Sequence, residues 1–493
     1  MTIEEILSLT DIGQKISLLK KGRRTEQPNK EELWNDWNPE KHEIVWNKDK
    51  YPDRKILEKE EQRVFDEKTG KTHVIDPKYH DEKTNRISIP MEQDIVNIQT
   101  AFTVGIEPKI DCTPSDESEE KLLSAIRKVL KSNKIKFRNK KVVRSWLSEQ
   151  EAAEYWYAVE DDSFWAKLWR SIKSTFTGNT KPNKKLKSTI WSPFRGDTLY
   201  PFFSEDGDLV AFSREYKKKV DDSEITMFMT ITDTSVYMWN ESELTEENSF
   251  KHGFSKIPVI YVYRPEAYCN KIRSFRERLE KLLSNYADCI DYHFFPMLKL
   301  IGDVTGFAGK TKDRIVQLEN GADAQYLTWS QVPDTVKFEA ETLTNMAYDM
   351  TNTPRISFET LKGIGKASGT AFRFMFMGAH MAVSNHAEEI EDFLQRRINF
   401  LVSALGSINP TEFDKSSKTI DIETEVVPFM IDDTNDKVTT AVAAVTGGVW
   451  SRREGIVFAG NADRVEEELK EIEEDIKKQK EVSNDRAKET SVR

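Results

Sequence analysis

The sequence predicts an α+β protein in which an antiparallel sheet and a set of long helices occupy separate stretches of the chain. From Ser188 to Tyr263, short apolar runs alternate with turns such as Asp206-Gly207, which is the pattern of antiparallel strands. From Tyr268 to Leu405, apolar residues recur at steps of three and four, which predicts amphipathic helices. The length of 493 residues leaves room for several domains.

The composition is that of a folded protein with a large hydrophobic core. Hydrophobic residues make up 38% of the chain and charged residues 32%, and the 26 Phe, 14 Tyr and 11 Trp supply core material. The formal net charge of −11 argues against a protein that grips nucleic acid by general phosphate neutralisation, which needs clustered Lys and Arg. It is compatible with a protein that surrounds DNA.

Cysteine use and apolar runs give expectations about the compartment. Cys112, Cys269 and Cys289 are isolated, which predicts neither a disulfide framework nor a cysteine zinc site and is typical of a reducing compartment. The first residues lack the basic and apolar regions of a signal peptide. Because no apolar run reaches about 18 residues, we expect no spanning helix and no membrane partner.

The N-terminal third predicts a docking segment, a hairpin and three helices. A helix is expected around Ile3–Leu19, and the following polar segment carries three tryptophans, which indicates that residues 1–60 dock on the body or on a neighbour. Short apolar runs on both sides of Gly70 predict a β-hairpin. The expected helices are Met91–Val104, Ser118–Ser132 and Val142–Val159.

A basic segment precedes the predicted sheet. Residues 166–188 hold seven Lys or Arg and no acidic residue, which is compatible with a surface for nucleic acid or a partner, although an exposed loop is favoured. The strands that follow are expected in a single meander. They are Thr189–Trp191, Thr198–Phe202, Leu209–Phe212, Ile225–Ile231, Ser235–Trp239 and Val259–Tyr263.

Two long helices enclose a short mixed segment. The first carries an apolar stripe from Ile272 to Ile290, with a charged opposite face. That face holds Arg273, Arg276, Glu277, Glu280 and Lys281. Two strand-like runs follow, Ile315–Leu318 and Gln325–Trp329, and the second helix runs from Pro333 to the break at Asn352-Thr353-Pro354.

The last third predicts a buried helix, one strand and a helical tail. From Thr370 to Val383 the helix is apolar almost all round, which indicates burial, here between subunits. Residues 419–426 alternate strictly and are expected to form a strand that returns to the meander. Helices follow at Thr434–Val445, at Ser451–Phe458 with a capping box, and from Asp463.

No pattern in the sequence predicts catalysis, a metal or a cofactor. The glycine-rich loop Gly363–Gly369 lacks a preceding strand, the G-x-G-x-x-G spacing and a Gly-Lys-Ser/Thr ending, so a flexible loop is favoured over a nucleotide site. His380 and His386 do not have metal-ligand spacing and are expected to be core or surface residues. Scattered acidic residues are compatible with a two-metal nuclease, but no motif supports one.

The order of these parts resembles that of the portal proteins of tailed bacteriophages, particularly long-tailed phages of Gram-positive hosts. His252–Ile260 is similar to the strand before their first stem helix, and Phe295–Gly302 to the end of that helix. Thr351–Pro354 together with Ala367–Ala371 is similar to their tunnel loop and the start of their spine helix. Asp463–Glu474 is similar to the closing helix of their crown.

The resemblance implies a portal fold with a wing, a two-helix stem, a small α/β clip, a long kinked spine helix and a helical crown. The implied division of the chain is a wing at 1–263 with a peripheral arm at 1–85, stem helices at 264–296 and 333–352, a clip at 297–332, a tunnel loop at 353–369, a spine helix at 370–405, a wing return strand at 406–431, a crown at 432–480 and a disordered tail at 481–493.

It also implies a ring of about twelve copies at one capsid vertex of the virion, assembled in the host bacterial cytoplasm. Double-stranded DNA would pass through the ring during packaging and ejection. The terminase large subunit would dock on the clip, a head-completion or adaptor protein would replace it, and the major capsid and scaffolding proteins would be further partners. The alternative is a virion scaffold or adaptor without a DNA channel.

Three basic residues lie in or beside the implied tunnel loop. We expect Arg355, Lys362 and Lys366 to approach DNA, while a solvated loop without DNA contact is the alternative. An acidic subunit repeated around a ring would repel the duplex from the channel wall, so a few loop cations could touch it without holding it.

Overall fold

A computed structural model describes most of the chain, in two units. The described residues are 2–59, 62–66, 71–75, 77–160, 184–220, 223–293, 297–301, 304–308, 315–318, 323–327, 332–355, 374–429, 434–460, 465, 468–475 and 477. Unit 1 comprises residues 1–354 and 378–428, and unit 2 comprises residues 355–377 and 429–493. Each unit is described by itself.

The N-terminus of unit 1 forms two short helices, α1 (Ile3–Ser8) and α2 (Ile12–Lys21), where the sequence predicted one. The break is at Asp11, whose side chain accepts hydrogen bonds from the amides of Gly13 and Gln14 and so starts a new helix. Both helices lie against a β-sheet. Their shared core consists of Ile6, Ile16, Leu19, Phe228 and Trp239.

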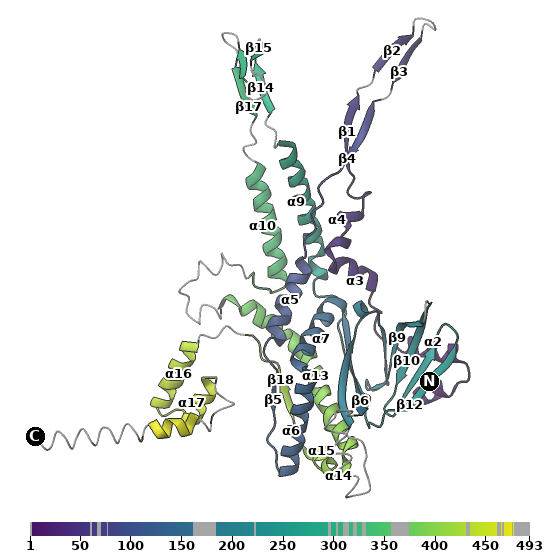
Figure 1. The fold of residues 1–493 in the computed structure, drawn as a ribbon, viewed down its shortest axis with the longest axis vertical. Helices are drawn as coiled ribbons and strands as arrows, with labels where there is room; N and C mark the ends of the chain where they lie inside the picture. Colours follow the sequence, from purple (N-terminus) through teal and green to yellow (C-terminus); the bar gives the residue numbers. More distant parts are fainter. Residues whose placement is uncertain are drawn as a thin grey trace, which may run out of the picture. The chain divides into compact units, whose positions relative to one another are not determined.

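The chain then crosses to the stem and forms a hairpin (Figure 1). Helices α3 (Lys30–Trp37) and α4 (Glu43–Trp46) flank a 3-10 turn at Pro39–Lys41. In the hairpin, β1 (Arg54–Lys59) pairs with β4 (Lys78–Glu82), and β2 (Gln62–Asp66) pairs with β3 (Lys71–Ile75). The predicted hairpin is confirmed, and it is longer than its two apolar runs indicated.

Two of the three helices predicted next are confirmed, and the third is wrong. Helices α5 (Met91–Val104) and α6 (Glu117–Ser132) lie where expected. In place of Val142–Val159 there is a helix, α7 (Ile135–Glu149), followed directly by a strand, β6 (Glu151–Glu160). Gln150 ends α7 in the left-handed region at φ 70°. Because Trp146, Ala153 and Trp156 happen to fit a helical period, the sequence pattern hid this break.

The predicted meander is divided between two sheets. Strands β8 (Thr198–Phe203), β9 (Leu209–Val220), β10 (Ser223–Ile231), β11 (Ser235–Asn240) and β12 (Thr245–Lys251) form an antiparallel sheet in sequence order. The other two, β7 (Lys184–Trp191) and β13 (Val259–Tyr263), flank β6 in a second sheet. The single-meander prediction was wrong because an alternating pattern identifies a strand but not the strand that it pairs with. The partner of β7 and β13 is β6, which the sequence pattern had predicted as part of a helix.

The two sheets share one core. Ala153, Trp191 and Tyr261 of the second sheet cluster with Leu199, Phe212 and Ile231 of the first, and all six are buried. Their faces therefore pack against each other, which is how amphipathic antiparallel sheets bury their apolar sides.

The stem consists of two helices joined by strands (Figure 1). Helix α9 (Arg273–His293) packs against α10 (Val332–Met350), and Arg278 pairs with Glu339 across them at 2.7 Å. Between the helices, β14 (Met297–Ile301) pairs with β17 (Asp323–Leu327), and β15 (Val304–Ala308) pairs with β16 (Ile315–Leu318). The described residues of this segment are all in strands, so the helical part of the expected α/β clip is not found among them.

The longest helix, α13 (Met377–Ile408), has buried residues from Ala379 to Gly406 and belongs to unit 1 from Gly378 onward. Two one-turn helices follow, α14 (Pro410–Phe413) and α15 (Ser416–Thr419), and then the short strand β18 (Glu423–Glu425). This return strand pairs with β5 (Lys109–Asp111) and not with the meander, so that prediction was wrong. Gln395 of α13 fixes β18 in place, because its Oε1 accepts a hydrogen bond from the Thr424 amide at 3.1 Å.

Unit 2 contains the helices α16 (Thr434–Thr446) and α17 (Arg452–Phe458), which confirm the two predicted there. The Ser451 side chain caps α17 by accepting from the Glu454 amide, which is one of the two hydrogen bonds of the predicted capping box. Residues 468–475 are helical, while residues 370–373 and the tail 481–493 lie outside the described part. Among the described residues, no helix is both long enough and apolar enough to cross a membrane.

Candidate functional site

The base of the stem is the most elaborate polar site among the described residues of unit 1. Helix α9 enters it between the arm helices α3 and α4 on one side and α5 on the other. At the centre, Arg276 is 2% exposed. Its Nη1 donates to Glu92 Oε1 at 2.7 Å and its Nη2 to Asp36 Oδ1 at 3.2 Å. One side chain of the stem thus joins the arm to α5.

One turn further along α9, a second buried pair repeats this link. Glu280 is 1% exposed, and its Oε1 lies 2.6 Å from Nδ1 of His42, which is 2% exposed. The same oxygen accepts a hydrogen bond from the Ile89 amide at 2.9 Å. Ser284, a further turn on, accepts from the Ile87 amide at 2.9 Å. The segment before α5 is therefore hydrogen-bonded to the stem helix at two successive turns.

Two residues of the charged face of α9, Arg276 and Glu280, are buried. The apolar stripe is also only partly buried, since Ile272 and Leu279 are inside and Ile290 is 43% exposed. The arm explains the difference, because it brings Asp36 and His42 onto the charged face and compensates the buried charges. The four-residue spacing of Arg276 and Glu280 was the only signal in the sequence, and it equally fits a surface pair.

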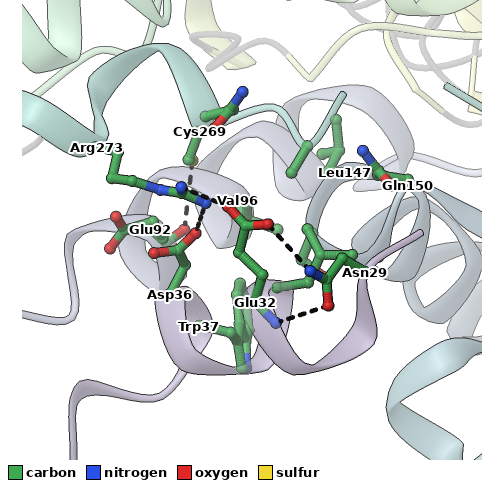
Figure 2. A pocket seen from close by; sticks show the side chains of 14 residues that line it. Asn29, Glu32, Asp36, Trp37, Glu92, Val96, Leu147, Gln150, Cys269 and Arg273 are labelled. Atoms are coloured by element: carbon green, nitrogen blue, oxygen red, sulfur yellow. Dashed lines mark hydrogen bonds and ion pairs between the residues drawn. The ribbon is translucent and has the colours of Figure 1, made fainter. Parts of the chain in front are cut away.

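A small pocket of about 130 Å³ opens beside these pairs. Figure 2 shows Arg273 reaching from α9 toward the carboxylates of Glu32 and Asp36. Glu92 lines the same pocket; burial raises the pKa of its carboxyl to about 7, although the Arg276 charge opposes this. The pocket has room for only a few water molecules. Its charged groups mainly satisfy one another.

Two properties of this site bear on its chemistry. Cys269 borders the pocket, but burial raises the pKa of its thiol well above the usual range, so it is held as the unreactive thiol. Among the described residues, no group of three or more His, Cys, Asp or Glu side chains could hold a metal ion. The contacts at this site attach the stem to the arm and to α5.

The second feature of the stem base is the end of α10, where the chain leaves the stem. The Gln99 amide of α5 donates to the Thr351 carbonyl at 3.1 Å and to Thr353 Oγ1 at 2.8 Å. The Tyr268 hydroxyl donates to the same Thr351 carbonyl at 2.6 Å. Asn352 turns the chain at φ 46°. These buried bonds fix the start of the predicted tunnel loop.

Of the predicted loop cations, the structure places one. Arg355 is exposed and follows the anchored end of α10 in sequence, as the first residue of unit 2. Lys362 and Lys366 lie outside the described residues, as does the whole glycine-rich loop. The approach of these three residues to DNA stays a prediction.

Of the two histidines of α13, His386 is a core residue. Its ring makes edge contacts with Trp146 at 5.4 Å and Tyr268 at 5.1 Å. Burial lowers the pKa of its imidazole to about 3, and the nearby Arg264 and Lys271 add to this. His380 is partly buried and makes an edge contact with Phe102 at 6.3 Å. The expectation of core or surface histidines is confirmed.

The buried imidazole predicts a loss of stability in acid. The pKa of His386 is lower in the folded state than in the unfolded state, so its contribution is complete above about pH 6.5 and is lost as the pH falls toward 3. The loss should be about 1.4 kcal/mol per pH unit across that window. We expect a His386→Leu variant to gain in thermal midpoint relative to wild type between pH 7 and pH 4. An unchanged difference between the two proteins would contradict this, since all other titrations are common to both.

Comparison with known proteins gives a family. Residues 30–482 match the family described as phage portal protein, SPP1 Gp6-like. Because the match spans most of the chain, the protein belongs to this family of phage portal proteins. No curated protein matches.

Solved structures that resemble the chain come from gene transfer agent (GTA) particles. One is a chain from the neck of the empty particle, with 13% identity, coverage of 76% of this chain and 90% of that chain, and a TM-score of 0.42. Another is a chain from the virion of the native particle, with 13% identity, coverage of 75% of this chain and 88% of that chain, and a TM-score of 0.37. A third comes from the neck of the native particle computed with C12 symmetry, with 11% identity, coverage of 76% of this chain and 90% of that chain, and a TM-score of 0.36.

Proposed function

We propose that this portal protein forms the ring-shaped head-to-tail connector at one vertex of the phage capsid. The observation that carries the proposal is the family match over residues 30–482, which includes the whole stem. A structural role agrees with the stem base, where the buried pairs of the described residues fix helices to one another and do no chemistry. The virion, after assembly in the cytoplasm of the host bacterium, is the proposed location.

The proposed parts follow the order of the chain. Residues 1–263 would form the wing, 264–296 and 333–352 the stem, 297–332 the clip, and 353–369 the tunnel loop. Residues 370–405 would form the spine helix, 406–431 the return strand and 432–480 the crown. The packing of α9 on α10 supports the stem, and the tip strands between them support the clip.

Exposed apolar side chains support self-association into a ring, for which we propose twelve subunits, as in a C12 arrangement. On α10, Phe338 is 71%, Met350 46% and Met346 39% exposed, although each lies on a helix that already packs on α9. On α13, Met381 is 58% exposed. Apolar side chains repeated along helices are usual at subunit contacts. The predicted burial of the apolar part of α13 would then be completed by a second subunit.

The ring would enclose the channel for double-stranded DNA during packaging and ejection. A net charge of −11 on each subunit supports passage without tight binding. The clip would receive the terminase large subunit and later a head-completion or adaptor protein. The major capsid and scaffolding proteins would contact the ring from outside.

Replacing Arg355, Lys362 and Lys366 together by alanine is expected to impair DNA packaging. These are the cations in or beside the proposed tunnel loop, and their loss would remove its electrostatic contact with DNA. The measurement is the amount of DNA protected in a reconstituted packaging motor, with ring assembly checked first by microscopy. Unchanged packaging by assembled rings would show that the loop lines the channel without touching DNA.

Negative-stain electron microscopy of the purified protein tests the main proposal. We expect rings with a central hole, and a mass by native mass spectrometry that gives the subunit number. A protein that stays monomeric at high concentration and low salt would contradict the connector. It would favour a scaffold or adaptor without a channel.

A further inference from the structure

A groove between α6, α7 and α13 has a cationic rim over an apolar floor. We call it the α6–α7 groove; its volume is about 620 Å³. Apolar side chains from three elements line it: Leu130, Ile135, Phe137, Leu394 and Ile398. Basic side chains surround them: Arg127, Lys131, Lys134, Lys136 and Arg397. This volume is within the range of pockets that bind ligands in proteins.

Four of these five charges have no ion-pair partner among the described residues, whereas Arg397 pairs with Glu154 at 2.6 Å. Arg127, Lys131, Lys134 and Lys136 are exposed, and within the described ranges none of them has an ion-pair partner. Glu107 is the only acidic residue among the described ones that lines the groove. In a chain with a net charge of −11, an uncompensated group of cations around an apolar floor is unusual.

The return strand keeps neighbouring acids out of the groove. Thr424 pairs with Ile110, and both line the groove, so this face of the β5–β18 ribbon points toward it. Glu423, Glu425 and Asp111 alternate with them and lie on the opposite face. The groove therefore stays positive although three carboxylates are one residue away in sequence.

Arg397, which lines the groove, has an unsatisfied hydrogen-bond donor. It is 2% exposed; its Nε donates to Glu154 Oε2 at 2.6 Å and its Nη1 to Asn139 Oδ1 at 2.7 Å. Its Nη2 is buried and has no hydrogen-bond partner among the described residues. A buried donor without an acceptor destabilises the fold, so a ligand that supplies an oxygen to it is favoured.

The entrance of the groove contains a further irregularity. Helix α7 begins after Lys134, which has φ 53° and makes no side-chain capping bond. A lysine in the left-handed region is strained, and Asn or Gly would be the usual choice there. The strained residue places one more cation at the rim, next to the positive end of the α7 dipole.

We propose that the α6–α7 groove binds an acidic peptide segment of a partner protein. A leucine-type side chain would occupy the apolar floor, and carboxylates would pair with the rim lysines and with Arg397. A peptide fits better than nucleic acid, because a phosphate backbone has no aliphatic group for the floor formed by Leu130, Ile135 and Ile398. The proposal does not depend on the ring.

The test measures, by fluorescence anisotropy, the binding of a fluorescein-labelled decapeptide to the full chain. The decapeptide is composed of Asp, Glu and two central Leu. Wild type should bind it, while peptides with Lys for the acids or Gly for the leucines should bind at least tenfold more weakly. Reversing two rim charges, Lys131→Glu with Lys136→Glu, should weaken binding by about tenfold or more. Phe137→Ser, at a side chain that is 60% exposed, should also weaken it.

The matched control is Lys128→Glu with Lys141→Glu. These lysines are exposed, lie on the same two helices and do not line the groove, so binding should change by less than about twofold. Equal losses in the two double variants, or full binding by the rim variant, would overturn the proposal. The proposal would also be overturned if a short DNA duplex displaced the peptide and if binding of that duplex required Lys131 and Lys136, because the groove would then be a nucleic-acid site.

Discussion

Replacing Arg276 by alanine is expected to destabilise the stem base by about 3–5 kcal/mol, which is the usual cost of breaking a buried ion pair by removing one partner. Arg276 is 2% exposed and bridges Glu92 and Asp36, so its loss leaves the buried Glu92 carboxylate without its cation. Thermal unfolding, monitored by differential scanning fluorimetry, should show a midpoint lower by several degrees. Limited proteolysis should also cut the arm faster, because its attachment to α9 is weakened.

Arg278→Ala is the matched control for this experiment. Arg278 lies two positions further along the same helix, and its side chain is 51% exposed in its pair with Glu339. Exposed pairs contribute about 0–1 kcal/mol, so this variant should unfold close to wild type. If Arg278→Ala were as harmful as Arg276→Ala, the effect would come from helix propensity or stem packing and not from the buried pairs.

Trp146→Ala should have a similar effect through a different cause. Trp146 is 1% exposed, contacts the His386 ring, and lies under the Arg264 guanidinium at 4.8 Å. Removing a buried indole leaves a cavity and costs about 3–5 kcal/mol. The expected result is a lower thermal midpoint, together with a loss of the tertiary near-ultraviolet circular dichroism contributed by this side chain.

Trp46→Ala provides the comparison for the buried tryptophan. Trp46 is 57% exposed, although its Nε1 donates to the Lys41 carbonyl at 2.9 Å. We expect a loss of about 1 kcal/mol or less from that hydrogen bond. A larger loss at Trp46 than at Trp146 would mean that the arm, and not the α7–α13 core, limits the stability of unit 1.

Elements with a strong local pattern could be predicted from the sequence. Helices α5, α6, α16 and α17 lie where their apolar period placed them, and the Ser451 cap was readable because capping is a contact between neighbours in sequence. The strands of the five-stranded sheet were mostly found as well. The break at Gln150 was missed, because a left-handed residue other than Gly or Asn gives no signal in the sequence.

The burial of the charged residues at the candidate site could not be predicted from local sequence patterns. The sequence placed Arg276 and Glu280 on the charged face of an amphipathic helix, and Asp36 and His42 in a separate peripheral segment. Their burial depends on contacts between residues more than 200 positions apart. The α6–α7 groove is of the same kind, because Lys131 and Lys136 come close to Arg397 only after α13 has packed on α7.

The sequence alone determined the α+β class, the two stem helices, the absence of a recognisable catalytic motif and, through the order of its parts, the resemblance to portal proteins. All of these follow from periodicity and short motifs, which act within a few turns of chain. The tertiary structure decided which strands pair, as with β18 on β5, and which charges are buried, as with Arg276. The physical reason is that pairing and burial are set by partners distant in sequence, whose positions no local pattern encodes.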